Sequence, residues 1–180
     1  MTYLINLLTL SRIFLAGVIF LLLTRPEGYI FALILFFVAG VTDYFDGYFA
    51  RKYNLTSKLG EILDPIADKI LIVFVLFGLS VNLSSYFIAF MASLIITREI
   101  WVGALRDFNA REGRSDATKV TFLAKIKTTI QLFTISIYLL GLSINNMLLV
   151  ISGDLFLFLS LLITLYTGYL YTLNTFKKKI

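Results

Sequence analysis

Long, nearly uninterrupted runs of Leu, Ile, Val and Phe are the feature of this sequence that most restricts its fold. Six runs come close to the roughly 20 residues that an α-helix needs to cross a bilayer. Of the 180 residues, 59% are hydrophobic, which is more than a soluble domain of this length ordinarily carries. The sequence therefore predicts an all-α integral membrane protein, a bundle of six transmembrane helices at residues 7–23, 29–49, 62–79, 86–105, 122–142 and 147–170.

Basic residues are distributed unequally between the predicted connections. Of the 16 Lys and Arg residues, Arg25 alone falls on one side of the membrane, and the others lie on or near the opposite side. Lys and Arg concentrate on the cytoplasmic side of membrane proteins, so both termini are predicted to be cytoplasmic. The first apolar run is interpreted as a retained helix, because Arg12 interrupts it and no signal-peptide cleavage pattern follows. Residues 1–180 are predicted to form a single membrane domain.

The residue types that are missing restrict the chemistry. The chain has no cysteine and no histidine, which excludes disulfides, thiolate metal sites and a histidine base. The net charge of +5 is explained by membrane orientation and anionic lipid headgroups. A nucleic-acid partner is not expected, because no soluble basic domain is present to hold one. Any reaction must therefore rest on carboxylates, basic groups and hydroxyls.

Four aspartates lie at the predicted cytoplasmic ends of the second and third helices. Asp43 and Asp46 share one face of the second helix, and Asp64 and Asp68 share one face of the third. Four carboxylates at one membrane level would repel one another unless cations held them together. Ligation by oxygen alone favours Mg²⁺ or Mn²⁺, and two ions are expected. The alternative is that the aspartates pair with cations of the same segment, namely Arg51, Lys52, Lys58 and Lys69.

The pattern D-x2-D-G-x2-A-R-x8-G-x3-D-x3-D is complete at residues 43–68 and resembles the signature of the CDP-alcohol phosphotransferase family. The resemblance implies that Asp43, Asp46 and Asp64 are metal ligands and that Asp68 is both a ligand and the general base. A second element, Asn6-x2-Thr9-x2-Arg12, is similar to the opening element of the family, with Ile5 at its usual proline. The CDP-lipid site implied by the two elements comprises Asn6, Thr9, Gly47, Ala50, Arg51 and Gly60.

Basic residues on the fourth and fifth predicted helices are candidates for binding the acceptor alcohol. Arg98 and Arg106 fall about 80° apart around their helix and could form one anion clamp. Lys125 and Lys127 are about 200° apart, so which of them faces the site stays open. Cations that converge on one cavity suit an acceptor that already carries a phosphate.

These basic residues, together with Thr97, Glu99, Thr128 and Gln131, resemble the branch of the family that makes phosphatidylglycerophosphate. This branch implies that the phosphatidyl group of CDP-diacylglycerol is transferred to sn-glycerol 3-phosphate, with release of CMP. The resemblance also implies a homodimer in the bacterial inner membrane, with its active site facing the cytoplasm.

Several alternatives stay open at this point. Enzymes of the same fold use other acceptors, namely phosphatidylglycerol in cardiolipin synthesis, serine or inositol phosphate. A cation transporter would place acidic groups near the middle of the membrane on several helices, whereas the aspartates here gather on two. A lipid-binding protein without activity would have no use for the metal-ligand spacing.

Overall fold

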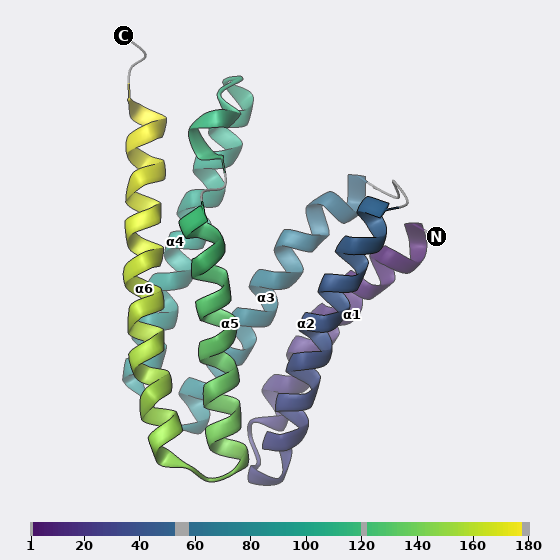
Figure 1. Cartoon of the computed structure of the whole chain (residues 1–180), viewed down its shortest axis with the longest axis vertical. Helices are drawn as coiled ribbons and strands as arrows, with labels where there is room; N and C mark the ends of the chain where they lie inside the picture. The colour runs from purple at the N-terminus through teal and green to yellow at the C-terminus, as the bar shows by residue number, and fades with distance from the viewer. Residues whose placement is uncertain (1, 53–57, 120–121, 178–180) are drawn as a thin grey trace.

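The computed structural model consists of six long α-helices joined by short connections (Figure 1). It describes residues 2–52, 58–119 and 122–177, without the side chains of 2–6, 44, 46, 47, 49–51, 58, 59, 61, 115, 124 and 125. Each apolar run predicted from the sequence falls on one of these helices. The helices are α1 (Thr2–Leu22), α2 (Tyr29–Lys52), α3 (Lys58–Asn82), α4 (Tyr86–Arg111), α5 (Phe122–Ser143) and α6 (Met147–Phe176), with 3₁₀ turns η1 (Pro26–Gly28) and η2 (Ser115–Thr118).

Within the described residues, four helical segments are long and apolar enough to cross a membrane, namely Pro26–Asp43, Tyr86–Arg111, Ile126–Ser143 and Met147–Phe176. The helix α1 contributes a shorter apolar segment, Leu7–Leu22. The charged side chains in the first half of α3 interrupt its apolar character. Large apolar side chains such as Phe14 and Phe31 are exposed on the outside of the bundle, as expected for contact with lipid. These features indicate an integral membrane protein, while six complete spans stay a prediction.

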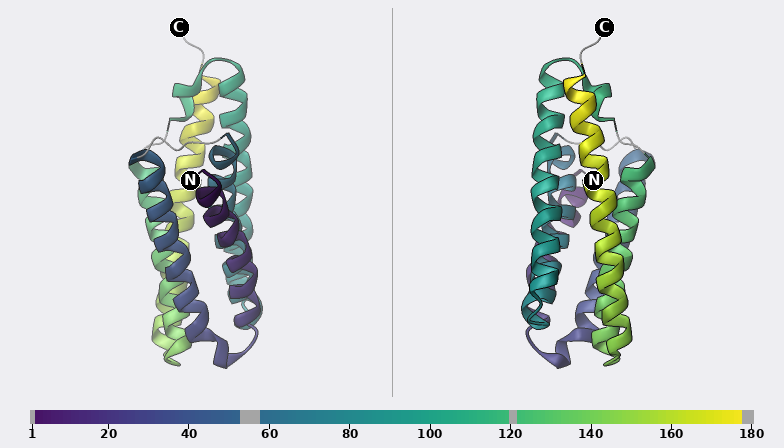
Figure 2. Two further views of the ribbon diagram at one scale, coloured as in Figure 1. Left: turned by 90° about the vertical axis from the view of Figure 1, so that its right-hand side faces the viewer. Right: turned by 90° about the vertical axis from the view of Figure 1, so that its left-hand side faces the viewer.

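The six helices form two arms, which meet at one end of the bundle and diverge toward the other (Figures 1 and 2). In one arm α1 packs along α2 and α3, and in the other α6 packs along α4 and α5. Contacts of α2 with α5 and of α3 with α4 join the arms. Consecutive helices run in opposite directions, so the end of α2, the start of α3, the end of α4 and the start of α5 lie toward the divergent end, together with the start of α1 and the end of α6.

Tight turns close the opposite end of the bundle. Ser84 and Asn145 adopt left-handed backbone conformations, with φ of 46° and 51°, two residues after α3 and α5 end. The next residues, Ser85 and Asn146, accept hydrogen bonds from backbone N–H groups in the first turns of α4 and α6. A left-handed residue that ends one helix and a polar cap that starts the next reverse the chain within a few residues. These turns hold α3 beside α4 and α5 beside α6.

The α5–α6 pair packs closely because Gly153 has no side chain. A Cβ atom at this position would lie 2.7 Å from the ring of Tyr138, which is fully buried. The Tyr138 hydroxyl donates a hydrogen bond of 2.6 Å to Asp154. The acidic group of α6 therefore has a partner inside the bundle, as an ionisable group within a membrane helix requires.

Replacing Gly153 with Ala is expected to lower the melting temperature of the detergent-solubilised protein by several degrees. The added methyl group overpacks the Tyr138 contact, at a cost of about 1–3 kcal/mol. Thermal unfolding followed by circular dichroism measures the change. The matched control is Gly17→Ala on α1, where an added Cβ meets nothing within 4 Å. Equal melting temperatures for the two variants would contradict this description of the α5–α6 contact.

Candidate active site

Three of the four predicted metal-ligand aspartates meet around one arginine of α1. The guanidinium of Arg12 forms ion pairs through Nη1 with Asp43 of α2 and with Asp68 of α3, the latter at 2.6 Å. Its Nη2 lies 3.7 Å from Asp64 Oδ1. Two carboxylates four residues apart on α3 and one in the C-terminal half of α2 thus converge on a single cation, because α1 packs against both helices. Arg12 is thus a partner of these aspartates that the list of Arg51, Lys52, Lys58 and Lys69 did not include, and the side chains of Arg51 and Lys58 lie outside the described residues.

The burial of this cluster is asymmetric. Arg12 is fully buried, whereas the side chains of Asp43, Asp64 and Asp68 are 46%, 47% and 50% exposed. Thr9, one helical turn before Arg12, is also fully buried and donates a hydrogen bond of 2.7 Å to Asp64 Oδ1. The α1 helix therefore supports the carboxylates from behind, and their exposed side is open to a ligand.

The donor chemistry of the cluster fits a hard divalent cation. The ligands are carboxylate oxygens, which Mg²⁺ and Mn²⁺ prefer, and they already surround a positive charge. Among the described side chains, no three acidic groups are arranged around a common metal position, since Arg12 occupies the point on which they converge.

A cavity of about 360 Å³ lies between α3, α4 and α5 and has Asp68 in its wall. This volume is within the range of about 300–1,000 Å³ that is typical of small-molecule sites. Four cationic side chains and two carboxylates line the cavity, which therefore favours an anion. Its polar wall consists of Asp68, Lys69, Arg98, Glu99, Arg106, Lys127, Thr128 and Gln131.

Arg98 is held in place by α6. It is 6% exposed, its Nε donates to the Thr164 carbonyl at 2.8 Å, and its Nη2 donates to the Thr167 hydroxyl at 2.7 Å. A Cβ at Gly168 would come within 3.0 Å of Arg98 Cγ, so the glycine lets the arginine lie flat on α6. Two donors of Arg98 therefore join α4 to α6, and its charge faces the cavity from a fixed position.

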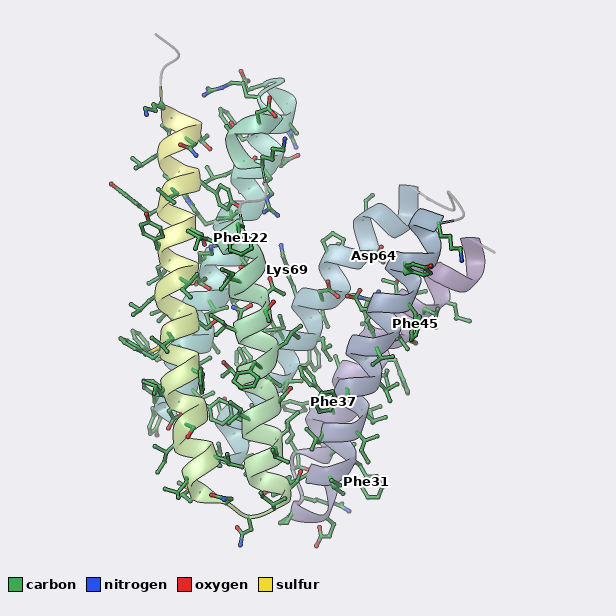
Figure 3. All side chains as sticks on the ribbon, viewed as in Figure 1. Phe31, Phe37, Phe45, Asp64, Lys69 and Phe122 are labelled. Carbon is green, nitrogen blue, oxygen red and sulfur yellow. The ribbon has the colours of Figure 1, made fainter. Side chains whose placement is uncertain are left out.

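The other cations of the cavity wall have fewer described contacts than Arg98. Lys127, 7% exposed, pairs with Glu99, and Glu99 also accepts a hydrogen bond of 2.7 Å from Arg98 Nη1. The Arg106 guanidinium lies 5.7 Å from the centre of the buried Tyr171 ring, in a cation–π contact. Lys69 extends from α3 toward the arm that contains α4 and α5, as Figure 3 shows. Of Lys125 and Lys127, Lys127 is thus the one whose placement in the cavity wall is described.

Some predicted site residues cannot be placed in the cluster or the cavity. Gly60 is buried in the first turn of α3. Thr9 acts through Asp64 and is not exposed. Predictions for the others concern side chains that the structure does not describe, and they stay predictions. These residues are Asn6, Asp46, Gly47, Ala50, Arg51 and Lys125.

Three residues of the site were not assigned to it by sequence reasoning. Arg12 was noted as a charge that interrupts an apolar run and as the last residue of the opening element, Glu99 as part of a motif, and Lys69 as an alternative partner of the aspartates. The signal that could have identified them is their depth, because each stands inside a helix of a membrane bundle, where ionisable groups are costly and functional.

Comparison with known proteins agrees with this geometry. Residues 2–166 match the sequence profile of the CDP-alcohol phosphatidyltransferase family, so this chain belongs to that family of enzymes. Enzymes of the family are generally metal-dependent.

The chain is similar to proteins described as CDP-diacylglycerol–glycerol-3-phosphate 3-phosphatidyltransferase from three organisms. That from Rickettsia bellii is 40% identical over 169 residues, covering 92% of this chain and 91% of the relative. The relative from Rickettsia typhi is 39% identical, and the match covers 92% of this chain and 93% of the relative. The relative from Escherichia coli K12 is 35% identical, and the match covers 73% of each chain.

Proposed function

We propose that this protein transfers the phosphatidyl group of CDP-diacylglycerol to sn-glycerol 3-phosphate, giving phosphatidylglycerophosphate and CMP. The observation that carries the proposal is the cavity whose wall contains Asp68 together with Arg98, Arg106 and Lys127. A phosphorylated alcohol needs a base that takes its hydroxyl proton, and Asp68 can supply this base. It also needs cations that bind its phosphate, and the three basic residues can supply them. The names of the relatives from Rickettsia bellii and Escherichia coli contain the same two substrates.

The reaction divides between the aspartate cluster and the cavity. Asp43, Asp46, Asp64 and Asp68 are proposed to hold two Mg²⁺ or Mn²⁺ ions. When bound, these ions supply positive charge that neutralises the pyrophosphate of the CDP-lipid. Asp68 accepts the proton of the acceptor hydroxyl while that oxygen forms a bond to the β-phosphorus. The bond from this phosphorus to the bridging oxygen breaks, and the electron pair leaves with CMP.

The basic residues orient the two substrates in this scheme. Arg106, Lys127 and Arg98 hold the acceptor phosphate, and Lys125 is proposed as a further contact. Arg51, with Asn6, Gly47, Ala50 and Gly60, is proposed to bind the CDP moiety, and Thr9 positions Asp64. Charges fixed before the reaction starts stabilise the charge that develops on the leaving group, because they need no reorganisation.

The position of the site relative to the membrane follows from the same proposal. We propose that all six helices span the bilayer, that residues 1–180 form one catalytic domain, and that both termini and the divergent end of the bundle face the cytoplasm. The membrane is proposed to be a bacterial inner membrane. The homodimer expected from the family resemblance stays a prediction.

An apolar groove is proposed as the seat of one acyl chain of the CDP-lipid. It has a volume of about 380 Å³ and is lined by α2, α3 and α5. Its lining includes Gly40, Val41 and Phe45, so it begins within one helical turn of Asp43. A lipid whose pyrophosphate lies at the aspartates could place its chain in this groove, since Val41 and Phe45 of its lining are each two residues from Asp43 on α2.

Replacing Gly40 with Leu is therefore expected to reduce kcat/KM for long-chain CDP-diacylglycerol by about tenfold, and less for a short-chain analogue. A Cβ at Gly40 meets nothing within 4 Å, so the backbone tolerates the change while the side chain fills the groove. The estimate corresponds to about two CH₂ groups displaced from an apolar surface, at about 0.8 kcal/mol each. Gly17→Leu on α1, also free of contacts, is the matched control. Equal losses with both chain lengths would place the acyl chain elsewhere.

The acceptor is tested by offering sn-glycerol 3-phosphate, phosphatidylglycerol, serine and inositol phosphate separately to the purified protein. Each assay contains CDP-diacylglycerol and Mg²⁺ in detergent, and CMP release is measured. We expect glycerol 3-phosphate to support the fastest release by at least one order of magnitude. Faster release with another member of the set would reassign the acceptor within the family. A cation transporter would release no CMP with any of them.

A further inference from the structure

The Arg12 guanidinium occupies the point where the carboxylates of two helices converge. It is fully buried, and its Nη1 contacts both Asp43 and Asp68. The carboxylates are about half exposed, so the arginine lies on their protein side and leaves their outer side open. The cation is supplied by α1, whereas the carboxylates belong to α2 and α3.

Electrostatic repulsion explains why a cation is needed between the three carboxylates. Three carboxylates at this spacing repel one another, and without a positive partner they would separate or take up protons. A buried guanidinium without carboxylate partners would be equally costly. The arginine and the aspartates therefore stabilise each other in the form of the protein that contains no divalent ion.

We infer that Arg12 is an internal counter-ion that holds the metal-binding aspartates together in the metal-free protein and competes with divalent ions for their oxygens. This inference rests on the proposed function, because it takes these aspartates as metal ligands. Metal binding must loosen the contacts of Arg12 with Asp43 and Asp68, since a second cation cannot share the same oxygens without repulsion. Arg12 thus keeps the aspartates close together without metal, and it lowers the affinity of their site for metal.

The test measures Mn²⁺ binding without any substrate, from the electron paramagnetic resonance signal of free Mn²⁺ in the presence of the purified full-length protein in detergent. Arg12→Met keeps the length of the side chain and removes its charge. We expect this variant to bind Mn²⁺ at least tenfold more tightly than the wild type. It should also melt at a lower temperature without metal and gain more stability on adding Mn²⁺.

Two further variants make the test specific. Arg12→Lys keeps the charge but loses the forked donor, so its Mn²⁺ affinity should lie between those of the wild type and Arg12→Met. Arg111→Met removes an arginine that is 77% exposed and paired with Asp107, and it should change Mn²⁺ affinity less than twofold. If Arg12→Met does not fold, tighter binding by Arg12→Lys supports the inference.

Weaker or unchanged Mn²⁺ binding by a folded Arg12 variant would overturn the inference, because a purely structural arginine lets the carboxylates separate when it is removed. This result would leave the proposed function intact if the wild type binds Mn²⁺ and makes lipid. A wild-type protein that binds no Mn²⁺ would contradict the metal part of the proposed function, and the inference with it. The two failures are therefore distinguishable.

Discussion

Asp68→Asn is expected to lower kcat by about 10²–10⁴-fold, the contribution typical of a general base. Asn keeps an oxygen that can accept from Arg12 Nη1, so the cluster can retain its shape, but the amide cannot take a proton from the acceptor hydroxyl. The activity should be measured at saturating Mg²⁺, and CDP-diacylglycerol binding should be measured in parallel. We expect binding to change much less than kcat.

The control for this variant makes the same chemical change outside the site. Asp107 is 62% exposed on α4 and pairs with Arg111, and Asp107→Asn should leave kcat and metal affinity near wild-type values. The Mn²⁺ affinity of Asp68→Asn separates its two proposed roles. Loss of activity that is fully recovered by raising the metal concentration would show that Asp68 is a ligand and would remove it as the base.

Arg106→Gln is expected to reduce kcat/KM for glycerol 3-phosphate by about 10–150-fold, mainly through KM. A hydrogen bond to a charged group contributes about 1.5–3 kcal/mol, and the substitution removes the charge that the acceptor phosphate needs. Arg106 is the suitable target because it is exposed at the cavity and contacts the Tyr171 ring, whereas Arg98 also joins α4 to α6. The KM for CDP-diacylglycerol should change little.

Arg111→Gln, which removes an exposed arginine of the same helix, is the matched control for Arg106→Gln and should preserve KM for both substrates. Arg98→Gln should differ from both, because it lowers the melting temperature as well as activity through its lost contacts with Thr164 and Thr167. A normal KM for glycerol 3-phosphate in Arg106→Gln would place the acceptor phosphate outside this part of the cavity.

The helices and the aspartates could be predicted from sequence because both depend on local periodicity. The starts of α2, α4, α5 and α6 coincide with the predicted apolar runs, and a turn residue and a polar cap precede α4 and α6. Asp64 and Asp68 share a face of α3 by helical spacing alone, and both reach Arg12.

The partners of these residues could not be predicted, because they depend on how distant helices pack. Arg12 reaches Asp43 and Asp68 only because α1 packs against both α2 and α3. Likewise, the sequence places Arg98 near an anion site, but only the packing of α4 on α6 shows that Thr164 and Thr167 bind it. The position of Lys127 also needed the helix rotation, which places this lysine beside Glu99.

The most direct test of the proposed reaction follows both products in one experiment. The purified protein is given CDP-diacylglycerol, Mg²⁺ and ¹³C-labelled glycerol 3-phosphate, and CMP and labelled lipid are quantified by mass spectrometry. The proposed chemistry predicts labelled phosphatidylglycerophosphate and CMP in equal amounts, lost on chelation of the metal and in Asp68→Asn. CMP released without labelled lipid, or no product from a folded protein, would contradict it.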